Sequence, residues 1–364
     1  MPMKNNNYRV RENAQLTKIL ANAPKGEYYL YTDMAQALGT VASVSDANVS
    51  VAGCVAQREE SVPASEALDA LADMSESSAR RGDYIDIFAN AAAEDQTSVT
   101  LGNAERADIY VSALEGFDGI SVARLVISAP AMVKTTAVVR LSSCGRLVLQ
   151  TKVNIGKGAN LTLVFLQDGD GDRVMLTRTT IDMDADSSAD ISFVNLNPAL
   201  ARNEIRCGLH AQGANLRMGG IYTVAEGGRV DNESLVEHIA GHTQSDQLFK
   251  GIADANGVMA FGGLILVKPD AQKVDANQTN RHMLASRDAR AYAKPQLEIY
   301  ADDVKCSHGA TTGQIDPQQL FYMQQRGIDE RTARKLLSAA FVGEVVDRIP
   351  LEDVRAALHE KLIG

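Results

Sequence analysis

Short β-like segments that recur at regular intervals restrict the fold of this chain more than any other feature. Six of them open with a small residue and continue with apolar residues; they start at Gly145, Gly158, Ser188, Gly213, Gly227 and Gly257. Successive starts lie 13, 30, 25, 14 and 30 residues apart, so the intervals cluster near one value and about twice that value. Such spacing, without helical periods between the segments, predicts the stacked coils of a β-solenoid. A β-sandwich, which also has short strands separated by turns, is the alternative from the pattern alone.

The repeat divides the chain into three predicted parts. Residues 1–83 are expected to form a small mixed, mostly helical cap, with helices at 13–23 and 61–81 and extended segments at 27–34 and 49–55. Residues 84–314 are expected to form the solenoid. Residues 315–364 predict three helices, because Asp316 and Pro317 fit an N-cap followed by a first helical position, a second helix starts near Asp329, and Pro350 separates it from a third.

Composition excludes several classes of function. The chain has 36 basic and 46 acidic side chains and a net charge of −10, so its surface should repel nucleic acid. It has no tryptophan, and no apolar run is long enough to predict a signal peptide or a membrane span. Its four cysteines are scattered without a C-x-x-C motif. We therefore expect a cytoplasmic protein with reduced thiols.

The window from Pro295 to Gly327 holds the best candidate site. If its first part is extended, the thiol of Cys306 and the imidazole of His308 emerge on one face of a strand, with Ser307 on the other. Thiolate and imidazole suit iron or zinc, but two ligands do not complete a metal site. From spacing alone, a structural role is the alternative, with Cys306 a small buried hydrophobe and His308 hydrogen bonded at a strand end.

Two stretches carry a family resemblance. The run LEIYADDVKCSHGATTGQIDPQQLFYMQQRGI, residues 297–328, resembles the C-terminal signature of the SufB/SufD family of iron–sulfur cluster assembly proteins. The preceding residues 244–286 resemble the final β-helix coils of the same family. The similarity is dense over about the C-terminal third of the chain and loose over the middle. The CSHGAT segment is similar to the corresponding segment of the SufD branch of this family, since the SufB branch typically carries an acid before and after the histidine.

This resemblance implies a right-handed parallel β-helix flanked by helical regions, in a scaffold and not an enzyme. It implies pairing with a SufB-like paralogue through the β-helix and docking of a SufC-like ATPase on the C-terminal helices. A nascent iron–sulfur cluster would form at the paralogue interface, with His308 as a ligand, Cys306 as a less certain one, and a cysteine from the partner. This chain would bind no ATP itself, and it could form a homodimer in isolation.

Other motifs favour structural roles. The DGDGD run at 168–172 departs from a calcium loop at the sixth and twelfth positions and predicts a solvated turn. The GKGAN run at 156–160 lacks the features of a phosphate-binding loop and predicts a coil corner. His238 and His242 are four residues apart, which in a strand would put both on one face; buried hydrogen bonding is favoured over a metal role. Asp302 and Asp303 are adjacent and would point to opposite faces, so they predict edge protection and a corner hydrogen bond.

Two other functions remain as alternatives. The first is a self-contained homodimeric interaction module. The second is a β-helix carbohydrate-active enzyme, which would need clustered carboxylates and aromatic sugar platforms. The absence of tryptophan and of an acid pair argues against the second alternative.

Overall fold

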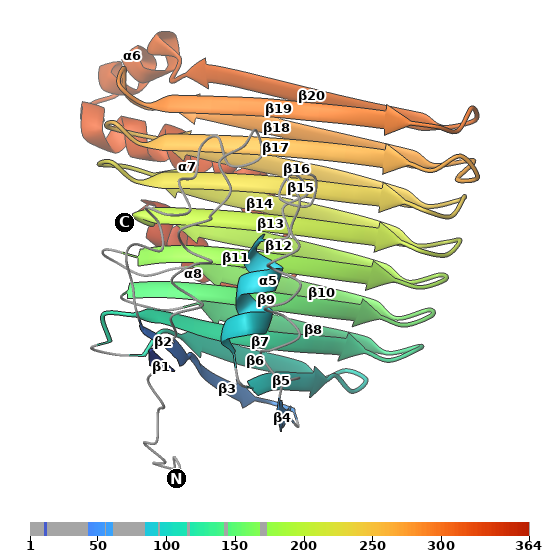
Figure 1. Cartoon of the computed structure of the whole chain (residues 1–364). Helices are drawn as coiled ribbons and strands as arrows, with labels where there is room; N and C mark the ends of the chain where they lie inside the picture. The colour runs from blue at the N-terminus through green and yellow to red at the C-terminus, as the bar shows by residue number, and fades with distance from the viewer. Residues whose placement is uncertain are drawn as a thin grey trace.

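Two long sheets face each other and form a parallel β-helix, which confirms the predicted solenoid (Figure 1). The computed structural model describes residues 11–12, 43–54, 56–60, 84–93, 95–114, 117–141, 145–167 and 173–363. From β5 and β6 onward, neighbouring strands within each sheet run parallel. The antiparallel pairs β1–β2, β3–β6 and β4–β5 lie at the N-terminal end of the stack.

Each coil contributes one strand to each sheet. Sheet A contains β1 (Arg11–Glu12), β2 (Ser43–Asp46), β4 (Ala56–Glu60), β5 (Asp95–Thr100), β7 (Ile120–Ala129), β9 (Gly145–Ile155), β11 (Arg173–Met183), β13 (Leu200–Leu209), β15 (Arg229–His238), β17 (Val258–Val267) and β19 (Arg290–Ile299). Sheet B contains β3 (Asn48–Ala52), β6 (Arg106–Ser112), β8 (Lys134–Leu141), β10 (Asn160–Gln167), β12 (Ser188–Leu196), β14 (Asn215–Val224), β16 (Gln244–Ala253), β18 (Asp275–Leu284) and β20 (Lys305–Gln314).

The register of sheet B explains the intervals in the sequence. Its strands from β10 to β20 align on one row of residues: Asn160, Ser188, Asn215, Gln244, Asp275 and Lys305. Steps of 28, 27, 29, 31 and 30 residues separate these positions, so one full coil takes about twice the short interval. The short interval from Gly145 to Gly158 leads from β9 in sheet A to the turn before β10 in sheet B.

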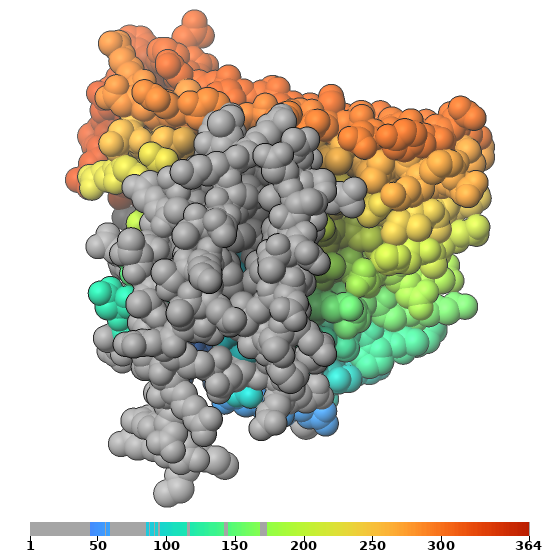
Figure 2. Space-filling view, viewed as in Figure 1, coloured from blue at the N-terminus to red at the C-terminus, as the bar shows by residue number. Residues whose placement is uncertain are grey.

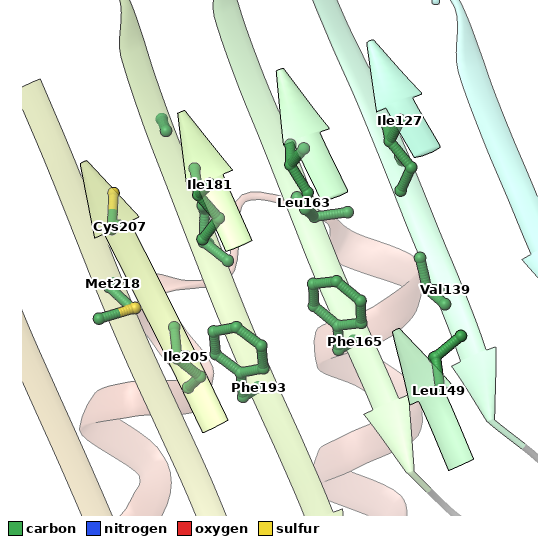
Figure 3. Close-up of a cluster of buried hydrophobic side chains, with 14 of the residues drawn as sticks. Ile127, Val139, Leu149, Leu163, Phe165, Ile181, Phe193, Ile205, Cys207 and Met218 are labelled. Atoms are coloured by element: carbon green, nitrogen blue, oxygen red, sulfur yellow. The ribbon is translucent and has the colours of Figure 1, made fainter. Parts of the chain in front are cut away.

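A continuous apolar core fills the space between the sheets. Alternate residues of each strand point inward, and in-register neighbours stack from coil to coil (Figure 3). The rings of Phe165 and Phe193, which are in-register partners in β10 and β12, stack with their centroids 5.0 Å apart. Because each coil buries its inward face only against its neighbours, the stack depends on this repetition.

The start of the β structure differs from the predicted boundary at residue 84. Strands β2, β3 and β4 precede that boundary: β2 and β4 belong to sheet A and β3 belongs to sheet B. Helix α5 (Tyr84–Ala92) packs on sheet A through Ile85 and Phe88. Pairing of the early strands covers the edge that the first coils would otherwise expose. The predicted helices at 13–23 and 61–81, the extended segment at 27–34, the DGDGD run and Cys144 lie outside the described residues.

The three C-terminal helices confirm the prediction for residues 315–364. They are α6 (Pro317–Gln325), α7 (Glu330–Arg348) and α8 (Glu352–Ile363). The carboxylate of Asp316 accepts a hydrogen bond from the Gln318 amide, and that of Asp329 accepts one from the Thr332 amide. Both acids therefore act as N-caps. None of the helices among the described residues combines the length and hydropathy that a membrane span requires.

Helices α7 and α8 lie against the outer face of sheet B. Their buried contact joins apolar residues of the sheet to apolar residues of the helices: Val138, Val164, Leu166, Val194, Ile221, Leu248, Ile252, Val342, Val345, Val346, Ile349, Val354 and Leu358. The buried ammonium of Lys250 lies 2.6 Å from a carboxylate oxygen of Glu344 and donates to the carbonyl of Phe341 at 2.7 Å. By contrast, α6 buries none of its residues.

Candidate functional site

The last coil leaves one end of the β-helix open. β19 and β20 are the final strands of their sheets, and no strand of the described chain pairs with the outer edge of β20 (Figure 1). In the space-filling view, the orange coils of this end form the upper edge of the molecule (Figure 2). Every residue of β20 except Cys306 is exposed. Lys305 is its one Lys, Arg, Asp or Glu, and the strand contains no proline. An edge strand of this length without such protection is suited to pair with another chain.

Cys306 and His308 share the inward face of β20, as the alternation in a strand predicts. They are in register with Ala276 and Gln278 of β18, which are both buried inside the helix. Ser307 faces the other way and donates a hydrogen bond to Asn277 Oδ1 at 2.8 Å. Because no further coil of the described residues covers β20, the imidazole of His308 is exposed although it lies on the inward face.

Cys306 is less accessible than His308. Its side chain is partly buried against an apolar cluster that includes Val274 and Ala276. Burial raises the pKa of the Cys306 thiol, and the nearby carboxylate of Asp275 raises it further, while a hydrogen bond from the Ala276 backbone acts in the opposite direction. A raised pKa favours the thiol over the thiolate, which is the form that binds metal. This environment favours His308 as the metal ligand of the two.

The described residues of one chain do not complete a metal site at this end. No group of three or more His, Cys, Asp or Glu side chains among them could hold a metal ion. Two neighbouring donors on an exposed strand amount to half a site, so the other ligands would have to come from elsewhere in the chain or from a second chain that covers β20.

A buried polar column, absent from the sequence-based expectations, lies behind His308. Gln278 and Gln247 are fully buried in-register neighbours in β18 and β16. Gln278 Nε2 donates to Gln247 Oε1 at 3.4 Å, and Ser234 Oγ of sheet A donates to the same oxygen at 2.9 Å. Inward-facing glutamines in successive coils were visible in the sequence, but their alignment depends on turn lengths that vary between coils.

A second buried polar group lies further along β18. Asn280 Nδ2 donates to the hydroxyl of Tyr222 at 2.8 Å, and that hydroxyl lies 2.6 Å from His282 Nε2. Tyr222 and His282 therefore share one hydrogen bond, whose donor depends on which ring nitrogen of His282 carries the proton. Burial lowers the pKa of His282 to about 4.

His238 and His242 do not lie on one face, contrary to expectation. His238 ends β15 and is buried, with Nδ1 2.7 Å from Thr243 Oγ1 and Nε2 2.9 Å from Ser245 Oγ. His242 lies in the following turn, exposed and with a positive φ of 56°. The alternation rule failed because the strand ends at the first histidine. The predicted buried hydrogen bonding is confirmed for His238.

The remaining motifs occupy corners of the coils. The Asp303 amide donates to Gln272 Oε1 at 2.9 Å, and its carboxylate pairs with Lys273 of the preceding coil. Asp302 is exposed beside it. The GKGAN run forms the turn between β9 and β10, with Gly158 at a φ of 64°. These positions fit the structural roles expected from the sequence.

Comparison with known proteins identifies the family. Residues 112–341 match the family model described as "SUF system FeS cluster assembly, SufBD core domain". A SufBD-family iron–sulfur cluster assembly protein of Synechocystis is 33% identical over 211 residues, covering 58% of this chain and 46% of that protein. The iron–sulfur cluster assembly protein SufD of Escherichia coli K12 is 38% identical over 173 residues, covering 46% of this chain and 41% of that protein.

The SufD protein of Bacillus subtilis is 32% identical over 136 residues, which cover 37% of this chain and 31% of that protein. The matched region thus spans about half or less of the length of these relatives. The residues that match the family model include the coils from β7 onward, the terminal strand that carries His308, and the first part of α7. Because the family model covers more than half of its residues, this chain belongs to the SufBD family of the SUF system of iron–sulfur cluster assembly.

Proposed function

We propose that this chain is a SufD-like scaffold subunit of the SUF complex, and not an enzyme. It pairs with a SufB-like paralogue, carries a SufC-like ATPase on its C-terminal helices, and holds a nascent iron–sulfur cluster at the interface between the paralogues. The cluster is cargo that is built and passed on. The SufD names of two relatives and the resemblance of the CSHGAT segment support this assignment.

One observation carries the proposal: an unprotected edge strand bears the candidate ligand. β20 is ten residues long, exposed and almost uncharged, and His308 lies on its inward face at the open end of the β-helix. A partner strand that pairs with this edge would extend sheet B and cover His308 at the same time. Exposed Ile299 and Tyr300, at 39% and 61%, supply apolar surface beside it. Formation of the dimer and completion of the ligand set would then be a single event.

In this complex His308 supplies a neutral imidazole nitrogen, and the partner supplies at least one cysteine. Cys306 is the secondary candidate, because its burial disfavours the thiolate. An imidazole ligand is more readily lost to protonation than a thiolate, which suits a cluster that must be released. Movement of the two paralogues, driven by ATP hydrolysis in the docked ATPase, would open or close the shared site.

The proposed docking surface for the ATPase is centred on α6. This helix buries no residue, and it exposes Phe321 and Tyr322 at 60% and 56%. Exposed aromatic residues on a helix that makes little contact with its own chain are typical of a protein interaction site. The packing of α7 and α8 on sheet B gives α6 a rigid base, so motion of the ATPase would be transmitted to the β-helix.

A homodimer is the second candidate, because the same β20 edge could pair with its own copy. A two-fold axis would place two His308 side chains near one another, without the cysteine that a SufB-like partner would supply. The carbohydrate-active enzyme is disfavoured by the lack of tryptophan. A homodimer and a heterocomplex differ in what copurifies with the chain.

The test is copurification of this chain, tagged, with a coexpressed SufB-like paralogue and SufC-like ATPase, followed by anaerobic cluster reconstitution. We expect both partners to copurify with the wild type, with His308→Ala and with the control His242→Asn, whose residue lies in an exposed turn. Cluster absorbance should fall in His308→Ala only. Copurification of the wild type with its own copy alone, or an unchanged cluster in His308→Ala, would refute the proposal.

A further inference from the structure

The residue behind His308 in the interior of the β-helix has an unused hydrogen-bond acceptor. Gln278 is fully buried, and its Oε1 has no hydrogen-bond partner among the described residues. A buried polar atom without a partner is rare in folded proteins and calls for an explanation. Gln278 is the in-register neighbour of His308 in the next coil. In-register residues of adjacent strands lie about 4.8 Å apart, which is within reach of their side chains.

The surrounding hydrogen bonds fix which way the amide of Gln278 is turned. Gln247 Oε1 accepts from Gln278 Nε2 and from Ser234 Oγ, so Gln278 must present its amino group toward the β16 side. Its carbonyl oxygen is therefore left for the other side, where β20 lies. His308 is at the position in β20 that a third member of this column would occupy.

The amide is also held against the opposite sheet. A Cβ built on Gly263 of β17 would lie 2.4 Å from Gln278 Nε2 and 2.5 Å from its Oε1. Gly263 therefore leaves the space that the amide fills, and the Gln278 side chain has little freedom to turn away from the column.

We propose that Gln278 is a positioning residue for His308: when the imidazole turns toward the interior of the β-helix, the free Oε1 of Gln278 accepts a hydrogen bond from one ring N–H, and the lone pair of the other nitrogen is then directed out of the open end. This role presupposes the proposed function, in which that second nitrogen binds the cluster. Metal-binding histidines commonly donate their other ring N–H to a carbonyl or carboxylate, which fixes the tautomer and the orientation of the ring. Here a buried side-chain amide supplies the carbonyl.

The test uses three variants. Gln278→Leu removes the amide at similar size. Gly263→Ala keeps the Gln278 amide but displaces it from the column, because the added methyl group would occupy the space that the amide fills. This variant keeps the proposal testable if Gln278→Leu fails to fold. The control is Gln167→Leu, because Gln167 is likewise buried with an unpartnered Oε1, but lies in β10, five strands from β20 in the same sheet.

The first readout needs no cluster. Nitrogen-15 NMR of His308 in the isolated chain, above the pH at which the ring is protonated, reports which ring nitrogen carries the proton. We expect one dominant tautomer in the wild type and in Gln167→Leu, and a mixture of both tautomers in Gln278→Leu and Gly263→Ala. The same tautomer populations in all four proteins would overturn the proposal.

The second readout is the rate of cluster release to an apo-acceptor protein from the reconstituted complex. Loss of a partner behind a metal ligand typically costs 10-fold to 100-fold in metal affinity, so we expect release at least about tenfold faster in Gln278→Leu and unchanged in Gln167→Leu. If the tautomer changes in Gln278→Leu while His308→Ala retains its cluster normally, the hydrogen bond stands and the proposed role of His308 as a ligand is refuted.

Discussion

Acid should destabilise this protein through two imidazoles that are buried in their neutral form. Burial lowers the pKa of His238 and of His282 from the ordinary value of 6.5 to about 4. A histidine with a lowered pKa in the folded state contributes stability that is fully present above the unfolded pKa. That contribution is lost as the pH falls through the folded value. The sensitive window is therefore pH 6.5 to 4.

The expected loss follows from the same pKa values. A difference between 6.5 and about 4 corresponds to about 3 kcal/mol for each imidazole, at 1.36 kcal/mol per pH unit. The two histidines differ in their hydrogen-bond partners. Both nitrogens of His238 face hydroxyl groups, which can accept from a protonated ring. In His282 only Nε2 has a partner, the Tyr222 hydroxyl, and a protonated ring would leave its Nδ1–H without an acceptor among the described residues. We therefore expect His282 to account for the larger share.

Urea unfolding of the wild type and of His282→Gln, measured at intervals from pH 8 to pH 4, tests this reasoning. Glutamine can still accept from Tyr222 but takes up no proton. The free energy of unfolding should fall between pH 6.5 and 4 by about 3 kcal/mol less in the variant than in the wild type. The control His242→Asn, in an exposed turn with positive φ that asparagine tolerates, should follow the wild type. Parallel curves for wild type and His282→Gln would refute the reasoning.

Three further predictions concern the outer faces of the sheets and the helices. Burial raises the pKa of Glu233 to about 7, although Arg202 acts in the opposite direction. The neutral carboxyl of Glu233 therefore contributes stability that is complete below pH 4.5 and is lost as the pH rises through 7. The free energy of unfolding of Glu233→Gln, measured in urea at pH 8, should exceed that of the wild type by up to about 3 kcal/mol. Val346→Ala removes two buried methyl groups between α7 and sheet B, so it should lower the free energy of unfolding by about 2 kcal/mol and speed up hydrogen exchange of the α7 amides. Unchanged exchange in α7 would contradict the packing argument. The double variant Phe321→Ala, Tyr322→Ala should change the free energy of unfolding by less than about 0.5 kcal/mol but abolish copurification of the ATPase. An ATPase that still copurifies with this variant would exclude α6 as its docking surface.

The coil architecture could be predicted because every coil repeats the same constraint. Strands such as β10 and β12 must present apolar residues inward at every second position, and small residues open each segment, so the spacing favours the stack over a β-sandwich. The N-caps Asp316 and Asp329 could likewise be predicted from the sequence, because an N-cap depends on residues within one turn of helix.

Features set by distant partners could not be predicted. β4 has the polar sequence AQREE and becomes a strand only by pairing with β5. In α7, Ala340 is exposed and Val342 is fully buried, because sheet B selects one side of a helix that is apolar on several. At the site, the strand alternation of Cys306 and His308 was local and predictable. Their alignment with Ala276 and Gln278 depends on the length of the intervening coil.

The central claim is that His308 binds the cluster through an imidazole nitrogen at an interface between two different chains. The most direct measurement is electron paramagnetic resonance of the reduced cluster in a complex where only this chain carries nitrogen-15 histidine and the SufB-like partner is unlabelled. We predict a strong hyperfine coupling from one nitrogen-15 nucleus, retained in His242→Asn and absent in His308→Ala. A paramagnetic cluster that forms in the complex but shows no coupling to labelled histidine would contradict the account.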